Sequence, residues 1–142
     1  MFVKIYAFLV FSLILVFGTH AAALGGFLSY EIWWLDIVLH FLGGLWIALF
    51  AFWFLFGYKN YSIDIISPGI LFVGLISFAV FAGVLWEFFE FSWDYFIAGP
   101  YGQIQAQRNL PDTMSDLFFD LAGALVASLC LSYYYRLGFK NS

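Results

Sequence analysis

Charged residues are scarce in this chain: they make up 10% of its 142 residues, with five basic side chains against nine acidic ones. Soluble domains contain about 25% charged residues, so the composition excludes an ordinary soluble domain. The basic residues are also scattered along the chain, which argues against nucleic acid as a partner. A single cysteine excludes a disulfide framework, and Cys130 lies in an apolar run where a small buried side chain is expected.

Apolar residues are abundant instead, since 65% of the chain is hydrophobic and 25% is aromatic. Runs of about 20 apolar residues are typical of membrane-spanning helices. Four such runs cover residues 5–24, 36–56, 68–93 and 113–135. The sequence therefore predicts an all-α fold, a polytopic transmembrane helical bundle in which residues 1–142 form one domain with four spanning helices.

The first run, residues 5–24, supports two interpretations. Lys4, the apolar stretch and Ala21-Ala22-Ala23 together are typical of a secretory signal peptide with its cleavage site. A run that reaches spanning length instead favours a helix that is retained in the bundle. We expect the retained helix.

Glycine and proline predict where these helices start, stop and approach one another. Pro68 and Pro111 suit the first turn of a helix. Residues 57–60 predict one turn and Gly99-Pro100 predicts another. The turn at Gly99-Pro100 belongs to a polar loop at 98–110. Small residues close together on one helix face let membrane helices pack closely. Such positions are Gly43 and Gly44, Ala79 and Gly83, and Gly123 and Ala127.

The basic residues predict the orientation of the bundle in the membrane. Four spans place Lys4, Lys59, Arg136 and Lys140 on one side and Arg108 on the other. Because basic residues concentrate in cytoplasmic loops, both termini are expected in the cytoplasm. The sequence thus predicts a multi-pass protein of the cell inner membrane.

Acidic residues recur at helical spacing on three of the four runs. Glu87, Glu90 and Asp94 are three and four positions apart, so they share one face of the third helix. Asp36 and His40 share a face at the start of the second helix. Asp112, Asp116 and Asp120 do so at the start of the fourth. With alternating helix directions, all eight side chains are expected in the outer half of the membrane.

Such a concentration of carboxylates needs compensation. An acid inside a spanning helix costs about 2.5–3.5 kcal/mol near its centre, and such groups usually face the bundle and serve a function. Like charges also repel one another, and a divalent cation offsets that repulsion. We therefore predict a site for magnesium, manganese, zinc or calcium. The expected ligands are Asp36, His40, Glu87, Glu90, Asp116 and Asp120.

The remaining polar residues are assigned lesser roles. Asp94, Asp112 and Arg108 are expected to surround the ligands without contacting the ion. Structural explanations compete for two of them, because Asp112 is near a helix N-terminus and Asp94 can be solvated at the interface. His20 ends the first run and is interpreted as an interface residue.

Three functions stay open at this point. The first is a metal-dependent hydrolase or transferase acting on a lipid head group, with Glu87 as the catalytic base because its neighbours are apolar. The second is a transport protein or subunit that moves protons or cations along the acids. The third is a structural or assembly partner with a protonated carboxylate cluster. Membrane lipids are the expected partners, and assembly into a homo-oligomer or a larger membrane complex stays open.

The chain resembles the YjdF-like family of small bacterial inner-membrane proteins in three motifs that cover most of it beyond the first run. The motifs are Asp36-x-x-x-His40-x-x-Gly43-Gly44, Gly83-x-x-Trp86-Glu87-x-x-Glu90-x-x-x-Asp94 and Asp112-Thr113-Met114-x-Asp116-x-x-x-Asp120-x-x-Gly123. That family has no assigned activity, so the resemblance implies location and architecture alone. A remoter likeness is to VanZ-like membrane proteins.

The spacing of Asp112, Asp116 and Asp120 is also similar to the second half of the CDP-alcohol phosphotransferase motif, whose acids bind metal ions. The first half of that motif, with its D-G and A-R pairs, is missing from this chain. The phosphotransferase activity is therefore not transferred.

Overall fold

The regular elements of the described residues are all helical. The structure, a computed structural model, describes residues 2–24, 33–62, 66–103, 105–107 and 109–140. In chain order the elements are α1 (Phe2–Leu24), α2 (Trp33–Phe52), the π-helical turn η1 (Trp53–Tyr58), α3 (Pro68–Trp93), the π-helical turn η3 (Asp94–Ala98), the short α4 (Gly99–Tyr101) and α5 (Leu110–Lys140). The predicted all-α fold is confirmed.

Three continuous helical stretches within the described residues are long and apolar enough to cross a membrane: Trp34–Tyr58, Pro68–Tyr101 and Leu110–Tyr134. The fourth expected span is α1, of which Tyr6–Ala22 forms a shorter apolar helix. With 23 residues in all, α1 is about 35 Å long, enough for a hydrocarbon core of roughly 30 Å. The helical membrane bundle is thus supported, and the crossing of α1 stays a prediction.

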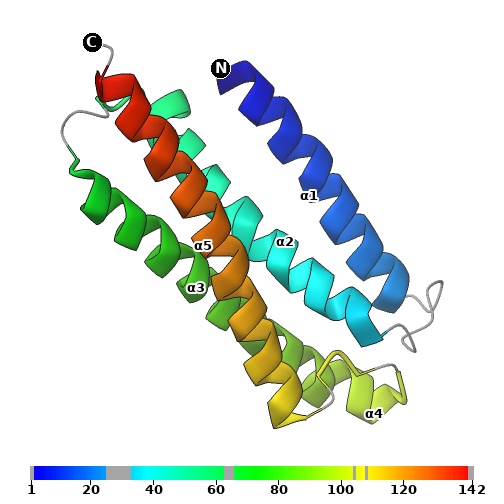
Figure 1. The fold of residues 1–142 in the computed structure, drawn as a ribbon. Helices are drawn as coiled ribbons and strands as arrows, with labels where there is room; N and C mark the ends of the chain where they lie inside the picture. The colour runs from blue at the N-terminus through cyan, green and yellow to red at the C-terminus, as the bar shows by residue number, and fades with distance from the viewer. Residues whose placement is uncertain (1, 25–32, 63–65, 104, 108, 141–142) are drawn as a thin grey trace.

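The long helices alternate in direction (Figure 1). The start of α1 and the end of α5 lie at the same end of the bundle, as four spans require. The start of α2, the end of α3 and the start of α5 lie together at the opposite end. If α1 crosses the membrane, this arrangement puts the start of α1 and the end of α5 on the same side of it, and the identity of that side as cytoplasmic stays a prediction.

Local signals explain where α3 begins and ends. Ser67 caps the helix by accepting a hydrogen bond from the backbone N–H of Ile70 at 3.3 Å, and Pro68 occupies the first turn as expected. The turn predicted at Gly99-Pro100 is wrong, because the helical path continues through η3 to Tyr101. Proline is compatible with the first turn of a helix, so Pro100 begins α4 instead.

The apolar core fills the half of the bundle that contains the ends of α2 and α5 and the start of α3. It is built from nine buried residues: Ala48, Phe52, Phe56, Leu71, Leu75, Ala79, Ala124, Ala127 and Leu131. These residues face one another across the helices. The outward faces of the helices carry large apolar side chains that are exposed, such as Phe78, Phe81 and Leu129. Exposed apolar side chains on every long helix suit a surrounding of lipid rather than water.

Cys130 belongs to that outward surface. It is exposed on α5, next to the exposed Leu129, so its prediction as a small buried side chain is wrong. The inward stripe of this part of α5 is instead formed by Ala127, Ser128 and Leu131. The apolar sequence around Cys130 could not distinguish the two faces, because both the core and the lipid are apolar.

Glycines bring α2 and α5 into close contact. A Cβ atom added at Gly44 would collide with the backbone of Asp120, and one added at Gly123 would collide with the carbonyl oxygen of Phe41. A side chain at either position would therefore force the two backbones apart. The predicted close approach at these glycines is confirmed, and it places Asp120 against the face of α2 that carries His40.

Candidate metal centre

The buried face of α3 changes from apolar to acidic along its length. Its buried residues follow one stripe, from Leu71, Leu75, Ala79 and Gly83 to Glu87 and Glu90. Glu87 is 6% exposed and Glu90 is 2% exposed, although most neighbouring side chains on α3 point outward. The same stripe that contributes to the apolar core therefore delivers two carboxylates to the opposite half of the bundle.

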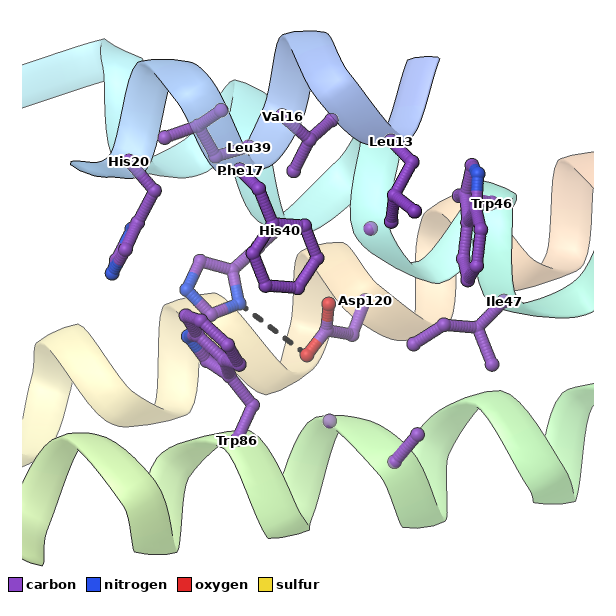
Figure 2. Close-up of a pocket in the computed structure, with 13 residues that line it drawn as sticks. Leu13, Val16, Phe17, His20, Leu39, His40, Trp46, Ile47, Trp86 and Asp120 are labelled. Carbon is purple, nitrogen blue, oxygen red and sulfur yellow. Dashed lines mark hydrogen bonds and ion pairs between the residues drawn. The ribbon is translucent and has the colours of Figure 1, made fainter. Parts of the chain in front are cut away.

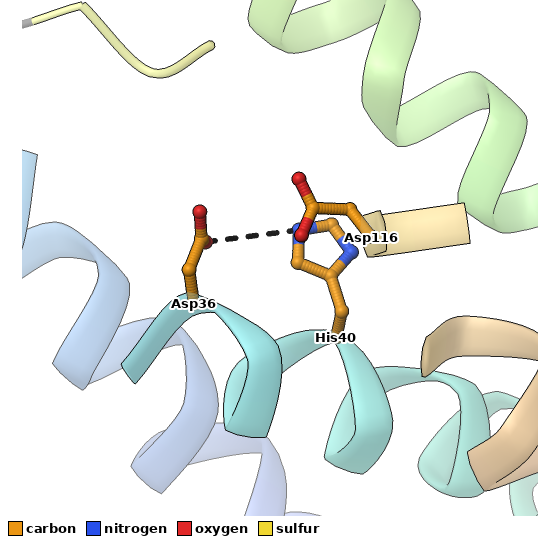
Figure 3. Close-up of side chains that lie close together, drawn as sticks. All are labelled: Asp36, His40 and Asp116. Atoms are coloured by element: carbon orange, nitrogen blue, oxygen red, sulfur yellow. Dashed lines mark ion pairs between the residues drawn. The ribbon is translucent and has the colours of Figure 1, made fainter. Parts of the chain in front are cut away.

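His40 lies at the centre of the acidic residues and is buried. Its Nε2 atom is 3.8 Å from Oδ1 of Asp36, one turn earlier on α2, and 4.0 Å from Oδ1 of Asp116 on α5 (Figure 3). These separations are longer than a hydrogen bond. Two atoms that each bind one ion at about 2.0–2.2 Å lie at most about 4.4 Å apart, so the observed spacing can accommodate a shared ion.

The other ring nitrogen of His40 faces Asp120. Nδ1 donates to Oδ2 of Asp120 at 3.3 Å (Figure 2). A carboxylate on one imidazole nitrogen fixes the tautomer that leaves the other nitrogen free to bind a metal. Gly83 makes room for this pair, because a Cβ atom at that position would collide with the Asp120 carboxylate.

Glu87 and Glu90 approach His40 from α3. Ligand atoms of His40, Glu87 and Glu90 lie within 4.8 Å of one another, as do those of Asp36, His40 and Asp116. The structure thus brings the other five predicted ligands around the imidazole of His40. We call Asp36, His40, Glu87, Glu90, Asp116 and Asp120 the His40 cluster.

The hydrogen bonds of the two glutamates leave a buried oxygen of Glu87 without a partner in the described residues. Oε1 of Glu90 accepts a hydrogen bond from Nε1 of Trp86 at 2.9 Å, and Oε2 of Glu87 accepts one from Nε2 of Gln107 at 2.7 Å. Oε1 of Glu87 is buried and has no hydrogen-bond partner within the described part of the chain. A buried polar atom without a partner costs about 1–3 kcal/mol, which favours an additional binding partner at this position.

The residues expected around the ligands have different roles. Asp94 accepts hydrogen bonds from the backbone N–H groups of Ala106 at 2.6 Å and Gln107 at 2.8 Å, and so fixes the loop after α4. Asp112 lies in the first turn of α5, where its N–H bonds to the side chain of Asn109 at 3.1 Å. The predicted role of Arg108 lies outside the described residues.

A pocket of about 180 Å³ adjoins the His40 cluster. Apolar side chains of α1, α2 and α3 form most of its lining, and His40 and Asp120 form part of its wall (Figure 2). His20 also lines this pocket, with its ring 5.0 Å from that of Trp86. Its interpretation as a membrane-interface residue stays a prediction. Helical spacing places His20 on the same face of α1 as Leu13 and Phe17, which also line the pocket, but it could not show that this face packs against α2 and α3.

Two further residues of the site were not predicted. Trp86 bonds to Glu90 and lines the pocket, and Gln107 bonds to Glu87. The first had a local signal, since Trp86 and Glu90 are four positions apart on one helix. Gln107 had none, because its position depends on the path of a loop.

Comparison with known families places the chain among membrane proteins. Residues 3–137 match a family described as predicted membrane protein (DUF2238). The chain belongs to this family. The resemblance to the YjdF-like family fits this result, whereas the likeness to VanZ-like proteins stays a prediction.

A relative in Thermotoga maritima, described as an uncharacterised protein, is 36% identical over 104 residues. The match covers 72% of this chain and 50% of the relative, so the chain spans about half the length of the curated relative that it matches. No solved structure matches the chain.

Proposed function

We propose that this protein is a metal-dependent hydrolase or transferase that acts on the head group of a membrane lipid, with a divalent cation held by the His40 cluster. The observation that carries the proposal is the position of His40. Its Nε2 atom faces two carboxylates at ion-binding distance, and its ring also lines the adjoining apolar pocket. In a membrane, this arrangement puts an ion site beside a space for a lipid.

The electrostatics of the cluster support a cation. Five carboxylates surround one imidazole, and four of the five belong to residues no more than 6% exposed. Even a protonated His40 supplies a single positive charge, so repulsion among ionised acids requires either bound cations or protons. Magnesium, manganese and calcium suit the carboxylates, and the imidazole extends the range to zinc.

We assign distinct chemical roles to the residues. Asp36, His40, Glu90 and Asp116 hold the ion, and Asp120 orients the imidazole from the opposite nitrogen. Glu87 is the general base, because its Oε1 atom is buried and accepts no hydrogen bond from Gln107, which bonds to Oε2 instead. In the hydrolase form, water oxygen attacks the head-group phosphorus and transfers its proton to Glu87. The bond from phosphorus to the leaving oxygen then breaks, and that oxygen takes up a proton.

The apolar core weakens the transport alternative. A path for protons or cations needs polar groups across the whole membrane, but Phe52, Phe56, Leu71 and Leu75 fill the other half of the bundle. Ser128 and Ser132 are polar exceptions on α5, and both hydroxyl oxygens are buried without partners among the described residues. We place the protein in the cell inner membrane, with the His40 cluster on the outer side.

Metal binding can be tested with purified protein in detergent. We expect elemental analysis to find stoichiometric divalent metal and a chelator to lower the melting temperature, since a ligand at 100 times its Kd stabilises a fold by about 2.7 kcal/mol. Asp116→Asn should abolish the chelator effect. Asp112→Asn, one turn earlier on the same helix, is the matched control and should retain it. Absence of metal, together with a melting temperature that ignores chelator and added magnesium, manganese, zinc and calcium, would contradict the metal proposal.

Catalysis needs a separate test in cells. Lipids of a deletion strain should show one head-group class accumulating relative to wild type, and the wild-type gene should reverse this change. Glu87→Gln should fold and yet fail to reverse it, because the amide cannot accept the proton. Full reversal by both Glu87→Gln and Glu90→Gln would favour the structural alternative, in which neutral hydrogen-bonding groups suffice.

A further inference from the structure

The pocket beside the His40 cluster lies between helices that hydrocarbon surrounds. Its volume is about 180 Å³, and its lining is mostly apolar. An apolar protein cavity of roughly 150 Å³ is large enough to hold benzene. By that measure the pocket accommodates a short hydrocarbon segment of about six carbon atoms, and not a whole lipid.

Polarity is graded along the pocket. His20 and Trp86 lie toward one end, and Trp46 and Ile47 lie toward the other (Figure 2). The hydrogen bond between His40 and Asp120 lies between these two groups. A ligand that fits this lining has a polar part near the histidines and an apolar part that extends along α2.

We infer that the pocket holds the first segment of one hydrocarbon chain of a membrane lipid, and that this segment places the polar head of the lipid beside His40. This inference rests on the proposed function, whose substrate it restricts to lipids with a chain attached close to the reacting group. A free, water-soluble phosphate ester has no part that would fill the apolar end.

The surrounding membrane explains what such a pocket contributes. A chain that leaves the bilayer for an apolar pocket exchanges one hydrocarbon environment for another, so it gains little hydrophobic free energy. The pocket therefore fixes position, and affinity must come from the polar end. His20 provides a suitable group there, because its Nε2 atom is buried and has no hydrogen-bond partner within the described ranges.

The packing of α1 suggests how a chain enters. Among the described residues, α1 packs mainly on α2 and η1, and Nε1 of Trp46 donates to the carbonyl oxygen of Leu9 at 2.8 Å. It meets α3 through aromatic contacts, in which Phe17 and His20 lie edge-on to Trp86 with ring centroids 5.8 and 5.0 Å apart. Movement of these rings can admit a chain without disturbing the apolar core.

Photocrosslinking in nanodiscs tests the inference with the full-length protein. The probe is a phosphatidylglycerol with a diazirine near the carboxyl end of one chain, diluted in unlabelled phosphatidylglycerol. We expect adducts on the pocket residues Leu13, Val16 or Ile47, mapped by mass spectrometry. Adducts confined to outward-facing residues, such as Phe11 and Ile14, would overturn the inference.

A pocket-filling variant gives the matched comparison. Ala82→Phe should lower the yield of pocket adducts about tenfold, because its ring occupies space that the chain needs; a tenfold change corresponds to about 1.4 kcal/mol. Ala7→Phe makes the same substitution at an exposed position on α1 and should leave the yield unchanged. If Ala82→Phe does not fold, Ile47→Trp fills the pocket from α2. An unchanged yield in the folded filling variants would contradict occupation of the pocket.

Metal content of the same samples separates the two proposals. Pocket adducts in a protein that contains no metal, and whose melting temperature ignores chelator and added metal ions, would leave the lipid site standing and overturn the metal-dependent function. Stoichiometric metal without pocket adducts would leave the metal site standing and overturn the lipid site.

Discussion

His40 is the residue on which the candidate site depends, because its two ring nitrogens face different carboxylates. Nε2 faces Asp36 and Asp116 at distances that exceed a hydrogen bond, whereas Nδ1 is hydrogen-bonded to Asp120. This difference in distance indicates two roles for the acids. Those at Nε2 are placed to share an ion, and Asp120 is placed to hold the imidazole.

Asp120→Asn tests this division. The amide keeps the size of the side chain but can present either a donor or an acceptor to Nδ1, so the favoured tautomer is no longer fixed. We expect the affinity for metal to fall about 10–100-fold, as for other groups that orient a metal-binding histidine. Isothermal titration with manganese or zinc measures this change.

Asp116→Asn supplies the comparison, since it removes a proposed ligand and should abolish binding. Equal losses in the two variants would show that Asp120 is itself a ligand, as the sequence predicts.

At the scale of the helices, the site depends on the contact between α2 and α5. Gly44 and Gly123 let the two backbones approach, and the approach brings Asp120 to His40. Adjacent glycines on α2 have different surroundings. A Cβ atom at Gly43 would lie 3.7 Å from Oδ1 of Asp120, an ordinary contact, whereas one at Gly44 would collide with the Asp120 backbone.

Gly44→Ala should therefore destabilise the bundle by about 1–3 kcal/mol, the usual cost of overpacking. Gly43→Ala is the matched control at the neighbouring position, and we expect a change within about 0.5 kcal/mol. Thermal or denaturant unfolding in detergent measures both. Similar stabilities of the two variants would mean that α2 and α5 are not in backbone contact at Gly44.

At the scale of the whole molecule, alternating helices place the six residues of the His40 cluster at similar depth. The cluster lies in the half opposite the apolar core, at the end of the bundle that holds the loop after α4 (Figure 1). Lys59 lies at the other end, with its ammonium 5.7 Å from the centre of the Phe54 ring. The basic residues predict that the end with Lys59 is cytoplasmic.

Reporter fusions test this topology in cells. A reporter joined after Lys59 should be cytoplasmic, and one inserted at Gln105 should be on the outer side, because α3 crosses the membrane between them. A reporter at the N-terminus should match the one at Lys59 if α1 is a fourth span. Fusions at Lys59 and Gln105 that report the same compartment would contradict the crossing of α3.

The sequence by itself determined the helical class and the end of the bundle at which the acidic residues meet. Length and hydropathy define the helices, since a run of about 20 apolar residues has few alternatives in a membrane. Helical spacing then places Asp36 with His40, and Glu87 with Glu90, on shared faces. Alternating directions bring these faces to one end.

Only the tertiary structure decided which atoms meet. The hydrogen bond between Nδ1 of His40 and Asp120 depends on how α5 is rotated about its axis against α2. Gly44 and Gly123 permit the close contact of the two helices, but hydropathy does not specify the rotation. The placement of Gln107 on Glu87 depends on a loop, and that of His20 in the pocket depends on how α1 packs. Cys130 shows the same limit, because core and lipid are equally apolar and periodicity alone cannot tell an inward face from an outward one.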